Sequence, residues 1–241
     1  MYEQLKEIID KSDNIVFLGG AGVSTESNIP DFRSADGLYN AKIKYGMSPE
    51  EMISHSFFMN DTETFYDYYF NNLIYPDAKP NVAHFALAKL EEMGKLKAVV
   101  TQNIDNLHQL AGSKNVLELH GSVYRNYCMD CGEFYSLQDI TDLDEPVPHC
   151  KKCGGIIKPD VVLYEEPLDN AVWNKAYKVI SEADVLIVGG TSLVVYPAAS
   201  LVSAYRGNKL VLINKGETAY DHLAAIAIHE SIGKVFSEVV K

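Results

Sequence analysis

The clearest chemistry in this sequence belongs to its four cysteines, which all fall between residues 128 and 153. They form two pairs, Cys128-x-x-Cys131 and Cys150-x-x-Cys153, with 18 residues between the pairs. Two such pairs at this spacing are typical of tetrahedral zinc sites. Because four thiolates fill the coordination sphere, no position is left for a reactive water. The spacing therefore predicts one structural Zn²⁺ per chain.

Other uses of this cysteine-bearing segment fit the sequence less well. A redox Cys-x-x-Cys pair would not need to be duplicated. His149 is a weaker candidate ligand than Cys150, because only Cys150 keeps the paired spacing. A nucleic-acid-binding ribbon needs a basic surface, yet residues 123–157 carry three basic and six acidic side chains. A zinc site without a role in nucleic-acid binding remains the prediction.

Polar residues follow several short apolar runs, at positions suited to ligand binding. The segments are Gly20-x-Gly22-x-x-Thr25 and residues 101–105, 189–195 and 213–217. In an open α/β sheet, ligands bind outside the carboxyl ends of the strands. Together the four segments predict a long cleft for a dinucleotide. Alone the glycine turn is a weak signal, because the third glycine of the dinucleotide-binding fingerprint is replaced by threonine.

Alternating strands and helices must position these segments. Short runs rich in Val, Ile and Leu indicate buried parallel strands; they lie at residues 14–18, 97–101, 116–119, 183–188, 209–214 and 225–229. Amphipathic segments between them predict helices over residues 81–93, 169–182 and 197–205. This alternation predicts an α/β fold with a Rossmann-type, doubly wound parallel sheet.

Two segments interrupt the alternation. Residues 37–80 are rich in aromatic residues and indicate a loop with short helices, and residues 123–157 hold the cysteines. We expect these insertions, one helical and one a zinc ribbon, to form a smaller domain. The remaining residues, 1–36, 81–122 and 158–241, are expected to form the Rossmann-type domain that binds the dinucleotide.

Composition limits the classes of partner. The chain has 241 residues, of which 47% are hydrophobic, so it can bury a sizeable core. Its net charge of −12 argues against a nucleic-acid surface. No apolar stretch approaches the ~20 residues needed to cross a bilayer, and the first residues lack the unbroken apolar run of a signal peptide. We expect a cytoplasmic protein without nucleic-acid or membrane partners.

Taken in order, the motifs resemble those of sirtuins, the NAD-dependent protein-lysine deacylases, and in particular their compact bacterial or archaeal members. The resemblance covers nearly the whole chain. It rests on Gly20-Ala21-Gly22-Val23-Ser24, Ile29-Pro30-Asp31-Phe32-Arg33-Ser34, Thr101-Gln102-Asn103-Ile104-Asp105, His120-Gly121, the cysteine pairs, Lys158-Pro159-Asp160-Val161-Val162 and Gly190-Thr191-Ser192-Leu193. It implies NAD as co-substrate, an acyl-lysine peptide as substrate, and nicotinamide, O-acyl-ADP-ribose and free lysine as products.

The resemblance also implies roles for individual residues. His120 is the expected general base, and Asn103 is expected to position a water or hydroxyl. The expected NAD contacts are Ala21, Thr25, Phe32, Arg33, Gln102, Ile104, Asp105, His120, Thr191, Ser192, Asn214 and Ile232. Val162 and Tyr164 are expected to contact the substrate, whose backbone would join the edge as an added strand.

Three departures from the sirtuin pattern have consequences. Gly19 replaces a usual threonine, so we expect a looser strand end there. Glu165 replaces a usual glycine, and a glutamate would be strained if that position has a positive φ. Members that prefer succinyl-lysine carry a Tyr-x-x-Arg pair, whereas residues 66–69 of this chain read Tyr-Asp-Tyr-Tyr. We therefore expect neutral acyl groups, acetyl first.

Other functions stay open at this point. A protein ADP-ribosyltransferase would use the same NAD site and pass ADP-ribose to a side chain. A non-catalytic NAD-binding or zinc-scaffold protein is disfavoured because Arg33, Asn103, Asp105 and His120 are all present. A dehydrogenase is disfavoured because the glycine loop lacks its third glycine and a placed acidic ribose ligand. The oligomeric state is open and compatible with a monomer.

Overall fold

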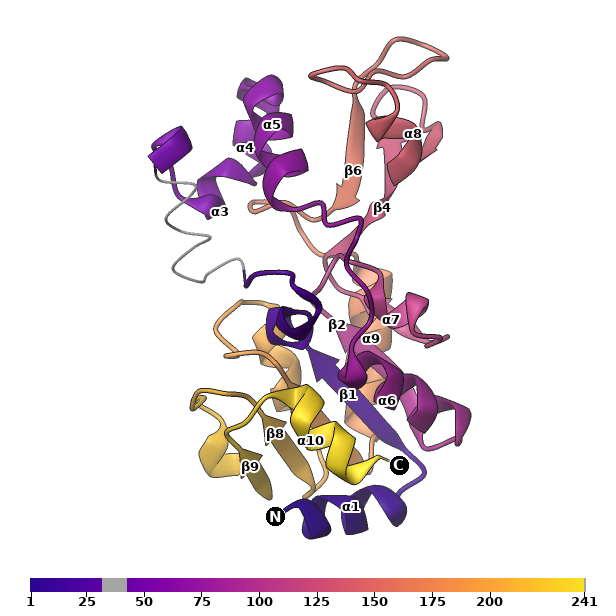
Figure 1. Cartoon of the computed structure of the whole chain (residues 1–241), viewed down its shortest axis with the longest axis vertical. Helices are drawn as coiled ribbons and strands as arrows, with labels where there is room; N and C mark the ends of the chain where they lie inside the picture. Colours follow the sequence, from indigo (N-terminus) through magenta and orange to yellow (C-terminus); the bar gives the residue numbers. More distant parts are fainter. Residues whose placement is uncertain (32–42, 241) are drawn as a thin grey trace.

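The computed structural model describes residues 1–31 and 43–240 and consists of two parts, joined by several crossings of the chain (Figure 1). The larger part is built on a six-stranded sheet in the order β3-β2-β1-β7-β8-β9, and all its pairs are parallel. The strands are β1 (Ile15–Gly19), β2 (Leu96–Thr101), β3 (Val116–Glu118), β7 (Val185–Gly189), β8 (Leu210–Ile213) and β9 (Ile226–Ile228). Each apolar run predicted as a strand forms one.

Helices cover both faces of this sheet. Helices α1 (Tyr2–Asp10), α6 (Val82–Glu92) and α10 (Ile232–Val239) share one hydrophobic cluster, to which Phe17 of β1 contributes. Helix α9 (Asn170–Glu182) packs in a second cluster with Val16 and Leu18. Successive β1 side chains enter opposite clusters because side chains alternate along a strand. The predicted doubly wound α/β class is confirmed.

One predicted helix has a different form. Residues 197–205 were expected to form an α-helix, but η3 (Ala198–Ala204) is a 3₁₀ helix. The Ser200 amide donates to the Pro197 carbonyl at 2.9 Å, and the Ser200 hydroxyl donates to the same oxygen at 2.7 Å. Serine side chains compete in this way with the α-helical hydrogen-bond pattern.

The smaller part holds a three-stranded antiparallel sheet in the order β5-β4-β6. Its strands are β4 (Gly121–Cys128), β5 (Phe134–Ser136) and β6 (Ile157–Val161), and its helices are α3 (Pro49–Met52), α4 (His55–Asn60), α5 (Thr62–Asn72) and α8 (Leu137–Thr141). Buried aromatic residues of α4 and α5 pack against this sheet. Strands β4 and β6 each run across one of the predicted domain boundaries, at residues 122/123 and 157/158. The exact domain boundaries stay predictions.

Arg125 of β4 connects the two sheets. Its guanidinium lies 2.7 Å from a carboxylate oxygen of Glu118, the last residue of β3 in the large sheet. It also lies 2.8 Å from a carboxylate oxygen of Asp160 in β6 of the small sheet. One side chain therefore joins both parts of the molecule.

The glycine at position 19 does not loosen the end of β1, contrary to expectation. Gly19 is paired with Thr101 of β2 on one side and with Gly189 of β7 on the other. A Cβ on Gly19 would stand 2.6 Å from a ring carbon of Phe17, so the packing leaves no room for threonine as the ring stands.

Within residues 1–31 and 43–240, no helix has the length and apolarity to span a membrane.

Candidate active site

Two glycine loops meet main chain to main chain at the carboxyl ends of β1 and β7. The amide of Gly22, in η1 (Ala21–Val23), donates to the carbonyl of Gly190 at 2.8 Å. A Cβ on Gly22 would lie 2.8 Å from the Gly190 Cα, so only glycine permits this approach. The contact brings together two of the four segments predicted to line the dinucleotide cleft.

A buried hydroxyl connects the loop after β1 to the segment after β2. The Ser24 hydroxyl donates to the Asp105 carboxylate at 2.6 Å and accepts from the Asn103 amide at 3.0 Å. The main-chain amide of Leu107 donates to the other Asp105 oxygen at 2.9 Å. Burial raises the pKa of Asp105, while the bonds from Ser24 and Leu107 favour the ionised form. The carboxylate is held in place as a hydrogen-bond acceptor.

His120 stands at the end of β3, where its ring orientation is fixed by a main-chain contact. Nδ1 lies 3.0 Å from the carbonyl oxygen of Gln102. Because a carbonyl only accepts, Nδ1 carries the hydrogen, and Nε2 of the neutral ring keeps its lone pair. Burial lowers the pKa of His120, and the bond to Gln102 partly opposes this. The ring can therefore accept a proton through Nε2 at neutral pH.

Most of the other residues expected to contact NAD lie just beyond the carboxyl ends of β1, β2, β7 and β8. The amide of Gln102, after β2, is 3.4 Å from the hydroxyl of Thr191, after β7. Ala21 begins η1 and Thr25 begins η2 (Thr25–Ser27), both after β1. Ile104 packs on the core of the small part, and Ser192 is exposed after β7. Asn214 follows β8, and Ile232 begins α10. Phe32 and Arg33 lie outside the described residues.

The two residues expected to contact substrate lie in the segment after β6. The Val162 amide donates to the main-chain oxygen of His120 at 3.0 Å, which places this segment beside the histidine. Tyr164 pairs instead with the turn between α3 and α4, through a bridge to Ser54. Next to it, Glu165 has φ +77°, in the left-handed region. The strain expected for glutamate at this position is therefore present.

The four cysteines converge as the spacing predicts. Their sulfur atoms all lie within 4.8 Å of one another, with 3.4 Å between those of Cys128 and Cys153 and 3.6 Å between those of Cys131 and Cys150. A tetrahedron with Zn–S bonds of ~2.3 Å has S–S edges of about 3.8 Å, so the set is suited to Zn²⁺. His149 does not belong to this cluster; it lies 3.4 Å from Glu145.

Glycines and a tyrosine support the cysteine cluster. Gly132 and Gly154, which follow the second cysteine of each pair, have φ +70° and +79° and close the turns. The Tyr135 hydroxyl donates to the Cys150 sulfur at 3.3 Å and accepts from the Lys151 amide at 2.9 Å. The hydrogen bond from Tyr135 lowers the pKa of Cys150 to about 6, which favours the metal-binding thiolate.

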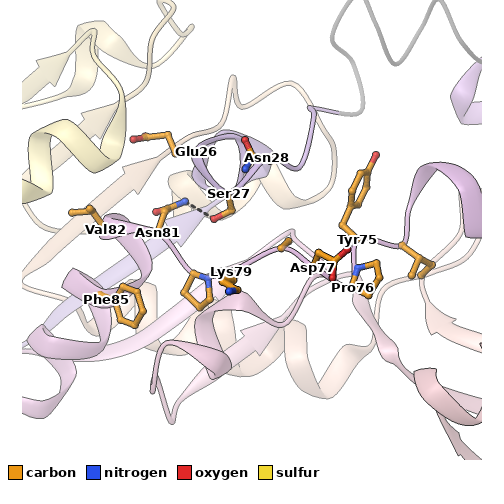
Figure 2. A pocket seen from close by; sticks show the side chains of 13 residues that line it. Glu26, Ser27, Asn28, Tyr75, Pro76, Asp77, Lys79, Asn81, Val82 and Phe85 are labelled. Atoms are coloured by element: carbon orange, nitrogen blue, oxygen red, sulfur yellow. Dashed lines mark hydrogen bonds between the residues drawn. The ribbon is translucent and has the colours of Figure 1, made fainter.

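A cavity of about 660 Å³ lies on another side of the glycine loop, between η2 and residues 74–82 (Figure 2). The residues that line this cavity include none of the described residues expected to contact NAD. Its lining begins at Glu26, the residue after Thr25. Asn81 closes one side, since its amide donates to the Ser27 hydroxyl and to the Val23 carbonyl, both at 2.8 Å. The cavity is therefore separate from the cluster around Asp105.

Three residues that hold loops in place, Ser24, Asn81 and Ser56, are not among the site residues expected from the sequence. Ser24 could have been noticed because it is a polar residue in a glycine turn that follows a buried strand, and it is 1% exposed. Asn81 caps α6, since its side-chain oxygen accepts from the Ala83 amide, and its amide group also holds η2 through Ser27. Ser56 carries no local signal, because its partner Glu165 is distant in the sequence.

Comparison with known proteins adds to this geometry. A family model described as "Sir2 family" matches residues 20–197. The NAD-dependent protein deacetylase of Clostridium tetani is 63% identical over 239 residues, which are 99% of this chain and 97% of the relative. That of Clostridium acetobutylicum is 62% identical over 237 residues, 98% of this chain and 97% of the relative.

A solved structure has the same architecture. It is that of a Sir2 protein with a deacetylated p53 peptide and 3′-O-acetyl-ADP-ribose, and it superimposes with a TM-score of 0.89. The match covers 98% of this chain and 96% of the other, at 40% identity.

Proposed function

Because the chain belongs to the Sir2 family, we propose that it removes acetyl groups from protein lysine side chains with NAD as co-substrate. One water is consumed, and nicotinamide, O-acetyl-ADP-ribose and free lysine are the products. One observation supports this most strongly: relatives described as NAD-dependent protein deacetylases match this chain over almost their entire length. The hydrogen-bonded group of Ser24, Asn103 and Asp105 beside His120 supports it independently.

Bound NAD would supply the glycosidic bond to nicotinamide, whose cleavage makes the ribose an acceptor for the acyl group. His120 then acts as general base. Its neutral Nε2 takes the proton from a ribose hydroxyl, while Nδ1 stays hydrogen-bonded to the Gln102 carbonyl. The bond from Nδ1 keeps the ring in one tautomer and one orientation, so the basic nitrogen needs no rearrangement before it accepts the proton.

Asp105 and Asn103 orient the reacting end of the co-substrate. We assign the Asp105 carboxylate to the amide NH₂ of nicotinamide, since an ionised carboxylate is a strong acceptor for such a donor. We assign the Asn103 side chain to a water or ribose hydroxyl. Ser24 holds both residues, so their spacing does not depend on the ligand. We assign Val162 and Tyr164 to the path of the acyl-lysine. Zn²⁺ bound by the four cysteines would stabilise the small part and would take no part in the reaction.

The decisive experiment incubates the protein with NAD and an acetyl-lysine peptide and follows all products by mass spectrometry. Loss of acetyl in step with formation of nicotinamide and O-acetyl-ADP-ribose is expected. The His120→Ala variant should lose nearly all activity, whereas His222→Ala, which removes an exposed histidine, should keep it. Transfer of labelled ADP-ribose to protein without deacetylation would replace the proposal with the ADP-ribosyltransferase alternative.

We also propose that the protein works in the cytoplasm. Its relatives are bacterial NAD-dependent enzymes, and four thiolates that bind metal must remain reduced. Fractionation of the producing cells, with detection of the protein by antibody, tests this. Recovery in the membrane or secreted fraction would contradict it.

A further inference from the structure

The segment after β6 is attached to the turn between α3 and α4 by its main chain. The Tyr164 amide donates to the Ile53 carbonyl at 3.0 Å, and the Tyr164 carbonyl accepts from the His55 amide at 2.9 Å. These two bonds form an isolated parallel bridge between residues that are about half the chain apart. Residues 53–56 and 163–166, here called the latch, thus join the helical insertion to the segment that we assign to substrate.

Glu165 has an unusual backbone within the latch. Its φ of +77° lies in the left-handed region, which is disfavoured for residues with a Cβ. Glycine would adopt this conformation freely. A non-glycine residue persists in such a conformation only where surrounding contacts hold it there, and such positions cluster at functional sites.

Two hydrogen bonds from Ser56 hold the side chain of Glu165. Its carboxylate accepts from the Ser56 amide at 2.8 Å and from the Ser56 hydroxyl at 2.6 Å, both at the same oxygen. These bonds keep the pKa of Glu165 below its usual value, so the side chain is charged at neutral pH. Charge-assisted hydrogen bonds of this kind are stronger than neutral ones.

The neighbouring Glu166 secures the other side of the latch. One of its oxygens lies 2.9 Å from Nδ1 of His55. The other accepts from the Leu163 amide at 2.9 Å and lies 3.1 Å from Nζ of Lys158 in β6. Glu166 therefore joins the two segments of the latch to each other and to the small sheet. Within the latch, Glu165 has the strained backbone.

We propose that Glu165 is a positioning residue for the acyl-lysine peptide, because its contact with Ser56 presets the backbone of residues 162–164 for the incoming strand. The inference rests on the proposed function, which assigns this segment to substrate. An added strand binds through main-chain hydrogen bonds. A backbone that is already fixed in the binding conformation loses less entropy when the peptide docks, so binding is tighter.

Four variants test the role of the contact. Glu165→Ala removes the carboxylate and keeps a Cβ at positive φ, whereas Glu165→Gly removes both. Ser56→Ala removes only the hydroxyl donor. The matched control is Asp139→Ala in α8, because Asp139 accepts from the amide and hydroxyl of Ser136 at 2.8 and 2.6 Å, the same geometry at a site outside the latch.

The expected signature is a change in KM without a change in kcat. KM for the acetyl-lysine peptide should rise about tenfold in both Glu165 variants, equivalent to the loss of one charge-assisted contact, and less in Ser56→Ala. Both kcat and KM for NAD should stay at the wild-type values, as for an interaction made equally in ground and transition states. The control should match wild type, and Glu165→Gly should melt at a higher temperature than Glu165→Ala.

Hydrogen exchange provides a readout that does not depend on activity. The main-chain amides of His55 and Tyr164 should exchange about tenfold faster in Glu165→Ala than in wild type or Asp139→Ala. Wild-type exchange rates in Glu165→Ala, or an unchanged peptide KM, would overturn the positioning role. An inactive wild-type protein would instead refute the proposed function. If hydrogen exchange were still faster in Glu165→Ala of such an inactive protein, the latch would be a purely structural contact. That result would also overturn the inference.

Discussion

The hydroxyl of Ser24 lies 2.6 Å from the carboxylate of Asp105, a residue 81 positions away in the chain. This bond holds the carboxylate at the ends of β1 and β2 and favours its ionised form. In Ser24→Ala the pKa of Asp105, which burial already raises, should rise further. We expect kcat/KM for NAD to fall about tenfold, as for the loss of a hydrogen bond to a charged group. Steady-state kinetics with varied NAD measure this.

Ser113→Ala is the control for Ser24, because the Ser113 hydroxyl is also buried but has no hydrogen-bond partner among the described residues. Its kinetics should equal those of wild type. Equal kcat/KM values for Ser24→Ala and wild type would show that Asp105 needs no support from the hydroxyl.

The pH dependence of the reaction should report the state of His120. Burial lowers the pKa of this ring, so the neutral, proton-accepting form persists to lower pH than in a free histidine. We expect kcat/KM for the acetyl-lysine peptide to decline in acid with a midpoint below pH ~6.5. A profile measured between about pH 5 and 8 tests this, and a midpoint near pH 7.5 would contradict it.

A buried histidine pair should make stability depend on pH. The rings of His84 and His108 lie 4.7 Å apart by their centroids, and burial lowers their pKa values to about 4 and about 3. In the unfolded chain both have a pKa of ~6.5, so the unfolded state binds protons first as the pH falls. Between pH 7.5 and 5, each histidine should reduce the free energy of unfolding by about 2 kcal/mol.

Urea unfolding at the two pH values tests this for His108→Leu. The variant should lose about 2 kcal/mol less than wild type over this interval. His222→Ala, in which an exposed histidine is removed, should show the full wild-type decline. The same decline in His108→Leu and wild type would mean that His108 titrates normally in the folded protein.

Metal content should follow the cysteine cluster. Wild-type protein is expected to hold one Zn²⁺ per chain by elemental analysis. Cys153→Ser should lose the metal and, with it, the near-ultraviolet dichroism of the packed aromatic residues in the small part, because metal binding supplies folding energy there. His149→Ala should keep both. Full zinc occupancy in Cys153→Ser would exclude Cys153 as a ligand.

Acyl preference can be tested with acetyl- and succinyl-lysine peptides of one sequence. Tyr66 and Tyr69 are fully buried, and the Tyr66 hydroxyl donates to the Ile157 carbonyl. Residues 66–69 contain no arginine to pair with a succinyl carboxylate. Because an unpaired buried charge is costly, the acetyl peptide should have a kcat/KM more than about tenfold higher. Equal values for the two peptides would remove the basis for this preference.

Features that depend on local patterns could be predicted from the sequence. Continuous apolar runs identified the six parallel strands, because strands buried on both faces need such runs. The spacing of the cysteines identified the metal cluster. Strain at Glu165 was predicted only on the condition that this position has a positive φ, and the structure meets that condition.

Features that depend on distant partners could not be predicted. Ser24 contacts residues after another strand, and Ser56 contacts a residue in the segment after β6; neither pairing leaves a periodic signal. The 3₁₀ form of residues 198–204 depends on side-chain competition at Ser200 and not on hydrophobic spacing. Phe32 and Arg33 stay predictions from the resemblance.

The double contact of Arg125 has a mechanical consequence. Its guanidinium forms ion pairs with Glu118 of the large sheet and with Asp160 of the small sheet, and so links the two parts. Rocking that moves these two carboxylates apart must stretch or break at least one ion pair. Ion pairs near the surface weaken as the salt concentration rises. The resistance of the two sheets to relative motion at Arg125 should therefore be highest at low ionic strength and should fall as salt is added.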